Sequence, residues 1–205
     1  EAHVPFRQAM SDSHFWLIFA SCFLCLGSGV TVINHVGNLV RSLGGYDDMQ
    51  DTFVVLLSVG SCMGRSGAGL ASDLHPTMPR PAFLLLASAA MATAQAMLVV
   101  PSLALLHASC LLAGGAFGAY WALVPVILAE LFGSRDFGKT YGASMLAPAL
   151  GSLFWSTLVA GSVYDAHAAS GTGRECLGWG CYRATFIVQT VGCLVGCGCA
   201  RRLLM

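Results

Sequence analysis

Charged residues are scarce in this sequence. Only 10% of the 205 residues are Asp, Glu, Lys or Arg, ten of each sign, whereas a soluble globular domain carries about 25%. This scarcity excludes a water-soluble fold, and the zero net charge leaves no basic surface for a nucleic-acid partner. The hydrophobic fraction of 56% and the mean hydropathy of +0.72 exclude a disordered chain.

Four long stretches, 13–40, 81–129, 140–164 and 184–200, contain no charged residue. Crossing the hydrocarbon core of a bilayer takes roughly 20 mostly apolar residues, and the second stretch is long enough for two crossings. We therefore predict an all-α membrane protein, with the lipid bilayer as its surroundings. Its six transmembrane spans are expected at about 15–40, 50–72, 82–100, 103–131, 138–162 and 183–203.

Three further absences limit the chemistry. The sequence has no phosphate-binding loop of the Gly-x-x-x-x-Gly-Lys-Ser/Thr type, so ATP-driven pumping by this segment is not expected. Asp and Glu are missing from the centres of all six predicted spans, which would place any proton-coupling carboxylate outside this segment. Cys193, Cys197 and Cys199 follow one helix without a second ligand cluster, so we predict no metal site and no cofactor.

The first fourteen residues lack the apolar core of a signal peptide. We expect residues 1–14 to be a cytoplasmic linker and residues 15–205 to be a six-helix bundle, the C-terminal part of a longer protein. Its missing N-terminal half is then a partner of this segment.

The distribution of Lys and Arg predicts the orientation. With six spans both termini lie on one side, and that side collects seven basic residues against three on the other. Because basic residues concentrate in cytoplasmic loops, we predict that both termini are cytoplasmic.

Glycines spaced four apart occur at 60 and 64, 114 and 118, 138 and 142, and 192 and 196. Such pairs let helices approach closely in lipid, so we expect tight packing, or sliding surfaces, at these positions. Pro125 and Pro148 fall inside predicted spans, where they predict kinks or interruptions that could line a pathway.

The end of the second span reads GRSGAGLASD from Gly64 to Asp73, with Arg65 and Gly69 inside it and Arg80 after it. This segment resembles the Gly-x-x-x-Asp…Arg signature of the major facilitator superfamily. In that setting the glycines permit close helix contact, and the carboxylate faces the positive end of a neighbouring helix.

A second segment, ELFGSRDFG, runs from Glu130 to Gly138 at the next cytoplasmic turn. It resembles the Glu…Arg turn between helices ten and eleven of the same superfamily. We predict that Asp73, Arg80, Glu130 and Arg135, together with Arg65, form a charge network that latches the cytoplasmic side. The alternative is that these are solvated loop charges.

More of the chain resembles a narrower group. The segments 15–17 (FWL), 27–34 (GSGVTVIN), 118–125 (GAYWALVP) and 130–133 (ELFG), with Cys176 to Gly178 and Cys181 to Arg183, are similar to the C-terminal half of nodulin-like transporters. That group lies near the monocarboxylate and oxalate/formate carriers. The resemblance implies a twelve-helix protein, of which this chain supplies helices seven to twelve as a three-plus-three inverted repeat. One departure is Ile33, where the family often has an acidic residue.

Several polar and aromatic residues inside the spans are candidates for the substrate pathway. Asn34 and His35 are polar residues in a span and could instead bond helix to helix. The other candidates could line a binding cavity or pack in the core, and they are Tyr120, Trp121, Pro125 and Tyr141. Cys176 and Cys181, in the long loop on the opposite side, are candidates for a disulfide if that compartment is oxidising.

Together these features predict half of a secondary active transporter, not an enzyme. It would move a small solute, with an organic anion as one candidate class, by alternating access. Two alternatives stay open: a non-transporting receptor or scaffold with the transporter fold, and a redox protein holding haem between His35 and His107.

Overall fold

The computed structural model describes residues 4–46, 49–75, 77–170 and 180–205, without the side chains of 167–170 and 181. Every element in these ranges is a helix. The bounds are α1 Phe6–Ala9, α2 Ser13–Ser21, η1 Cys22–Leu26, α3 Gly27–Ser42, α4 Met49–Leu74, α5 Arg80–Met97, α6 Leu103–Phe132, α7 Phe137–Ser144, α8 Leu146–Ser152, η2 Leu153–Ala160, α9 Gly161–Ser170 and α10 Gly180–Arg202.

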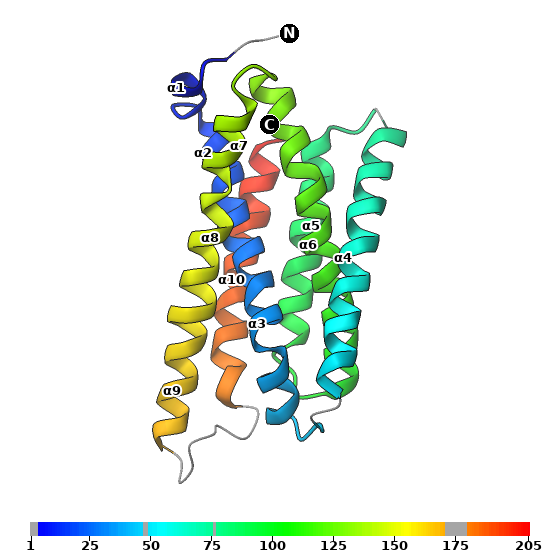
Figure 1. Cartoon of the computed structure of the whole chain (residues 1–205), viewed down its shortest axis with the longest axis vertical. Coiled ribbons are helices and arrows are strands. Elements are labelled where there is room, and N and C mark those ends of the chain that lie inside the picture. Colours follow the sequence, from blue (N-terminus) through cyan, green and yellow to red (C-terminus); the bar gives the residue numbers. More distant parts are fainter. Residues whose placement is uncertain (1–3, 47–48, 76, 171–179) are drawn as a thin grey trace.

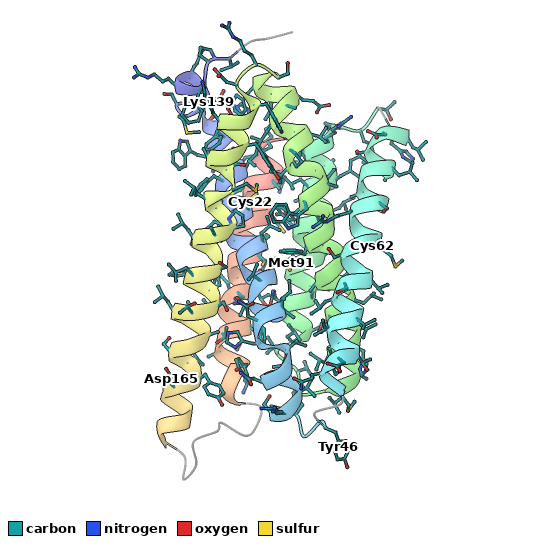
Figure 2. All side chains as sticks on the ribbon, viewed as in Figure 1. Cys22, Tyr46, Cys62, Met91, Lys139 and Asp165 are labelled. Carbon is teal, nitrogen blue, oxygen red and sulfur yellow. The ribbon has the colours of Figure 1, made fainter. Side chains whose placement is uncertain are left out.

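The described helices run side by side as a bundle (Figure 1). The helices α2, η1 and α3 follow one another as a continuous 30-residue rod, Ser13–Ser42, and a second rod of the same length covers Phe137–Ala166. The short helix α1 and the C-terminal end of α10 lie at the same end of the bundle, while α9 lies at the opposite end. Two labelled side chains, Tyr46 and Asp165, also lie at that opposite end, far from Lys139 (Figure 2).

Five described helical segments are long and apolar enough to cross a membrane: Ser13–Ser42, Met49–Leu74, Leu103–Phe132, Phe137–Ala166 and Tyr182–Arg202. Their bounds agree with five of the six predicted spans to within a few residues. The remaining predicted span, at about 82–100, is occupied by α5. This helix has only 18 residues and begins with Arg80 and Pro81, so any crossing by α5 would have to include that charge. The all-helical membrane fold is confirmed, and the crossing by α5 stays a prediction.

A seam of glycines joins α4 to α6. A Cβ atom on Gly60 or Gly64 would run into the backbone carbonyls of Leu111 or Gly115, and one on Gly118 would run into that of Ser61. The close approach predicted for the first two glycine pairs is therefore confirmed, because only hydrogen fits between these backbones. Since apolar burial drives little association in lipid, this contact fixes α4 against α6.

Other glycines behave differently. Gly138 and Gly142 on α7 and Gly69 on α4 have open space where a Cβ would stand. The tight packing predicted for the pair Gly138 and Gly142 is therefore not found within the described chain. The exposed faces on which they lie remain available to whatever covers this bundle.

Tyr120 closes a buried hydrogen-bond chain at the centre of the bundle. Its hydroxyl lies 2.7 Å from the Oγ of Ser21 on α2 and 2.6 Å from the Oγ of Ser88 on α5. Ser88 also donates to the carbonyl of Leu84 at 2.8 Å, so the donors run from Ser21 to Tyr120 to Ser88. The chain ties three helices together with no donor left over.

Neither proline inside a predicted span ends its helix. Pro125 lies within α6, which continues to Phe132, and Pro148 lies within α8, which continues into the π-helix η2. Where α3 crosses α8, a Cβ on Gly27 would stand 2.6 Å from the carbonyl carbon of Gly151. The π-helices η1 and η2 adjoin this crossing, and a π-helical turn often marks a functional site.

Candidate functional site

Three charged residues meet where α4 and α6 end and α5 begins. Arg80 donates from Nη2 to Oδ1 of Asp73 at 3.1 Å and from Nε to Oε1 of Glu130 at 3.0 Å. The two carboxylates come from α4 and α6, so Arg80, the first residue of α5, joins all three helices. We call these three residues the charge cluster. Because both carboxylates are more than half exposed, each pair contributes about 0–1 kcal/mol, so the cluster is easily opened.

Arg65 and Arg135, expected in the same network, lie elsewhere. Arg65 lies over the indole of Trp121, with its guanidinium carbon 5.9 Å from the ring centroid. Arg135 lines a surface hollow of about 330 Å³ beside Asp136 and Lys139. Lys139 and the main-chain N–H of Phe6 hold the pKa of Asp136 below its usual value of 3.8, and the charge of Arg135 lowers it further.

The position of Arg65 is unusual for an arginine. It lies within the apolar helix α4, nine residues before its end at Leu74, which is about 13 Å at 1.5 Å per residue. A charge at such a depth is costly in lipid unless it faces protein or water. A cation over an indole ring recovers part of that cost. This face of α4 therefore lies against protein or a water-filled space, not against lipid.

A cavity of about 320 Å³ opens next to this pair, between α3, α4 and α6. Ser61, one helical turn before Arg65, and Phe117, one turn before Trp121, both line it, and the Phe117 and Trp121 rings lie 6.0 Å apart. The lining is apolar apart from two hydroxyls and consists of Gly29, Ile33, Val54, Leu57, Ser58, Ser61, Ala113, Gly114 and Phe117. We call this the α3–α4–α6 cavity, which was not expected from the sequence.

Asn34 and His35 bond neighbouring helices. Asn34 donates to the Oγ of Ser156 on η2 at 3.0 Å, and the Nε2 of His35 lies 3.1 Å from the carbonyl of Ser156. The other ring nitrogen of His35 lies 3.4 Å from the hydroxyl of Tyr182 on α10. Both residues therefore make the helix-to-helix hydrogen bonds that were considered as the alternative to a pathway role.

The remaining pathway candidates lie in three different surroundings. Tyr120 is fully buried in the hydroxyl chain described above. Pro125 is half-buried one turn beyond Trp121 on α6. Tyr141 stacks on Phe137 at a centroid distance of 5.4 Å near the start of α7.

The two histidines of the haem alternative, His35 and His107, face different aromatic rings. His107 faces Phe53 at a ring distance of 4.4 Å, whereas His35 faces Tyr182. Among the described residues no group of three or more His, Cys, Asp or Glu could hold a metal ion. The predicted disulfide lies outside the description, because Cys176 and the side chain of Cys181 are not described.

The fold resembles that of a solved transporter. The crystal structure of a bacterial homologue of the human lysosomal transporter Spinster, inward-facing and unoccupied, matches 95% of this chain with a TM-score of 0.70. The sequences are 16% identical, and the match covers 48% of that protein. This likeness concerns the fold, and it matches the major facilitator architecture predicted from the motifs.

Fungal proteins named "probable transporter MCH1" are similar in sequence. The Yarrowia lipolytica protein is 28% identical over 91% of this chain, and the Neurospora crassa protein is 25% identical over 94%. The Aspergillus fumigatus protein is 24% identical over 86%. The chain spans only 41%, 39% and 35% of the lengths of these three relatives, respectively.

Residues 3–204 match the family described as "NFD4, C-terminal domain". That match covers nearly the whole chain, and it agrees with the nodulin-like motifs and with the fold. The chain therefore belongs to the NFD4 C-terminal domain family, with the fold of the C-terminal half of a nodulin-like major facilitator protein.

Proposed function

We propose that this chain is the C-terminal half of a secondary active transporter that moves a small organic anion by alternating access. The observation that carries the proposal is Arg65, a cation inside an apolar helix beside the α3–α4–α6 cavity. An arginine fork matches a carboxylate in geometry and charge, and the neighbouring cavity, with mostly apolar walls, offers space for the solute. The names of the fungal relatives support transport.

In this proposal the N-terminal half of the transporter precedes this chain and covers its exposed faces. The short helix α1 and the C-terminal end of α10 lie at one end of the bundle (Figure 1), together with the charge cluster. Counted from the sequence without Arg65, basic residues on that side exceed those on the other by six to three, which supports a cytoplasmic location for it. Six spans, with α5 as the third, would complete the three-plus-three repeat.

The charge cluster is the proposed latch. Its three residues hold the ends of α4, α5 and α6 together through exposed pairs of small energy, so a conformational change can break them. Arg135, on the turn after Glu130, belongs to the same proposed gate. Trp121 and Arg65 face the pathway, whereas Tyr120, Asn34 and His35 hold the helices that surround it.

Transport by the intact protein in proteoliposomes tests the proposal. Uptake of labelled lactate, oxalate and citrate would be compared for wild type, Arg65→Gln and Arg65→Lys, with Arg201→Gln as a control at the exposed end of α10. We expect Arg65→Gln to reduce uptake of the transported acid at least tenfold at unchanged membrane yield, and the control to leave it unchanged. Asp73→Asn should slow transport more than it lowers yield.

Two outcomes contradict the proposal. If a carried anion is found and Arg65→Gln transports it normally, the arginine does not bind the solute. If none of the three acids is carried, and Arg65→Gln and Asp73→Asn alter only folded yield, the scaffold alternative is favoured.

A further inference from the structure

The segment before the first membrane helix is docked on the bundle. Residues 4–12, which we call the strap, contain α1 and reach the turn between α6 and α7. The main-chain N–H of Val4 donates to the carbonyl of Phe132 at 3.3 Å, and that of Phe6 donates to Oδ2 of Asp136 at 3.3 Å. Ala9 is fully buried. The part of the chain expected to be only a linker therefore has its own bonds to the bundle.

The strap is also fixed at its other end. The indole Nε1 of Trp16 donates to the carbonyl of Met10 at 2.9 Å. Asp12 then caps α2, with its carboxylate accepting the main-chain N–H of His14 at 2.8 Å. Both ends of the strap are thereby held, one by α2 and one by the turn after α6.

Asp136 is oriented in an unexpected way. It occupies the N-cap position of α7, where a carboxylate ordinarily accepts an N–H from the first turn of its own helix. Asp136 makes no such bond. One carboxylate oxygen accepts from Phe6 of the strap, and the other accepts from Lys139 at 2.8 Å. The side chain thus bonds the strap and the side chain of Lys139, and not a main-chain N–H of its own helix. Figure 2 shows Lys139 beside α1 at this end.

The turn that Asp136 closes begins at the charge cluster. Glu130, six residues earlier on α6, is bonded to Arg80, and the carbonyl of Phe132, which accepts from Val4, lies between them in sequence. The turn is thus bonded to Arg80 through Glu130 at one end and to the strap through Phe132 and Asp136 at the other.

We propose that Asp136 is a positioning residue that docks the strap on the α6–α7 turn only while the charge cluster holds that turn in place. The proposal rests on the proposed function, in which the strap connects this bundle to the preceding half. Opening the cluster then loosens the strap, and the two halves gain freedom to rearrange. Closing it restores one fixed connection between them.

Limited trypsin digestion of the full-length protein in proteoliposomes tests the docking without any substrate. The strap contains one trypsin site, the exposed Arg7 in α1, and the exposed Arg201 and Arg202 on α10 provide an internal reference. Asp136→Ala should increase cleavage after Arg7 roughly tenfold, the effect of losing one hydrogen bond to a charged acceptor. Asp136→Asn keeps an acceptor for Phe6 and should increase it less, while Ser134→Ala, on the same turn, should leave it unchanged.

The role of the charge cluster is tested by a double-mutant cycle. Arg80→Gln touches no strap residue, yet it should increase cleavage after Arg7 several-fold in the wild type and have no further effect in Asp136→Ala. Additive effects of the two changes would overturn the coupling. An unchanged rate in Asp136→Ala, or an equal increase at Arg7 and at Arg201, would overturn the docking. Because cleavage is measured without transport, either failure is distinct from failure of the transport proposal.

Discussion

Replacing Gly118 by alanine is the most direct perturbation of the glycine seam between α4 and α6. The added methyl group would run into the carbonyl of Ser61 and stand 2.9 Å from the Cα of that residue. Both atoms belong to the backbone of α4, so no side chain can rotate away to make room. The two helices must separate, and the neighbouring contacts at Gly64 and Gly114 loosen with them.

The size of the effect follows from overpacking. Extra methyl groups in a filled interior cost about 1–3 kcal/mol, while alanine gains up to about 1 kcal/mol over glycine in helix propensity. Gly142→Ala gains the same propensity and meets nothing within 4 Å, so the difference between the two variants isolates the steric term. For a chain of this size 1 kcal/mol shifts Tm by about 2–4 °C, which places Gly118→Ala roughly 2–12 °C below Gly142→Ala.

Thermal unfolding of both variants in one detergent, followed by circular dichroism, measures this difference. Gly64→Ala, which would meet the carbonyl of Gly115, should behave like Gly118→Ala and gives a second determination if one variant is produced poorly. Equal Tm values for Gly118→Ala and Gly142→Ala would refute the conclusion that backbone contact holds α4 to α6.

Two further predictions concern hydrogen bonds. Tyr120→Phe leaves the buried hydroxyl of Ser21 without its acceptor and should lower the free energy of unfolding by about 1–3 kcal/mol in a denaturation assay. Adding Ser21→Ala to this variant should recover part of the loss. A double variant less stable than Tyr120→Phe alone would contradict the assigned donor order. Because Lys139 and Phe6 lower the pKa of Asp136 below 3.8, its contribution to docking is complete above that value and is lost as the pH falls through the lowered pKa. The amide of Phe6 should therefore show steady protection from hydrogen exchange between about pH 5 and pH 8 and lose it only below 3.8, and this pH-dependent loss should be absent in Asp136→Ala. A loss of protection between pH 5 and pH 7 would assign the docking to another group.

The sequence was informative wherever a feature follows from local composition. Apolar stretches located the spans because crossing a bilayer imposes a length, and the motif around Asp73 and Arg80 correctly brought two helices to one charged turn. Glu130 bonds Arg80 as well, which is part of the five-residue network expected from the two motifs. These residues lie at helix ends, where short loops restrict what can meet.

Features that depend on helix rotation were missed. Nothing in the residues around Arg65 specifies which face of α6 it meets, so its contact with Trp121 could not be predicted, and the arginine was assigned to the wrong neighbours. The docking of the strap depends on the main-chain N–H of Phe6, a group that every residue except proline carries. Gly138 and Gly142 have the spacing of a packing motif, yet spacing does not say whether a helix lies opposite.

The π-helix η1, Cys22–Leu26, bears on how this protein tolerates a change in chain length. A π-helical turn holds one residue more than an α-helical turn, so the first rod carries a spare residue between α2 and α3. Deleting one residue there would convert the turn to α-helix and leave α3 facing Ser156 and Tyr182 as it does now. The same deletion in the middle of α4 would rotate everything beyond it by about 100° and turn Arg65 away from Trp121. The first rod can therefore lose one residue at this turn, whereas α4 cannot.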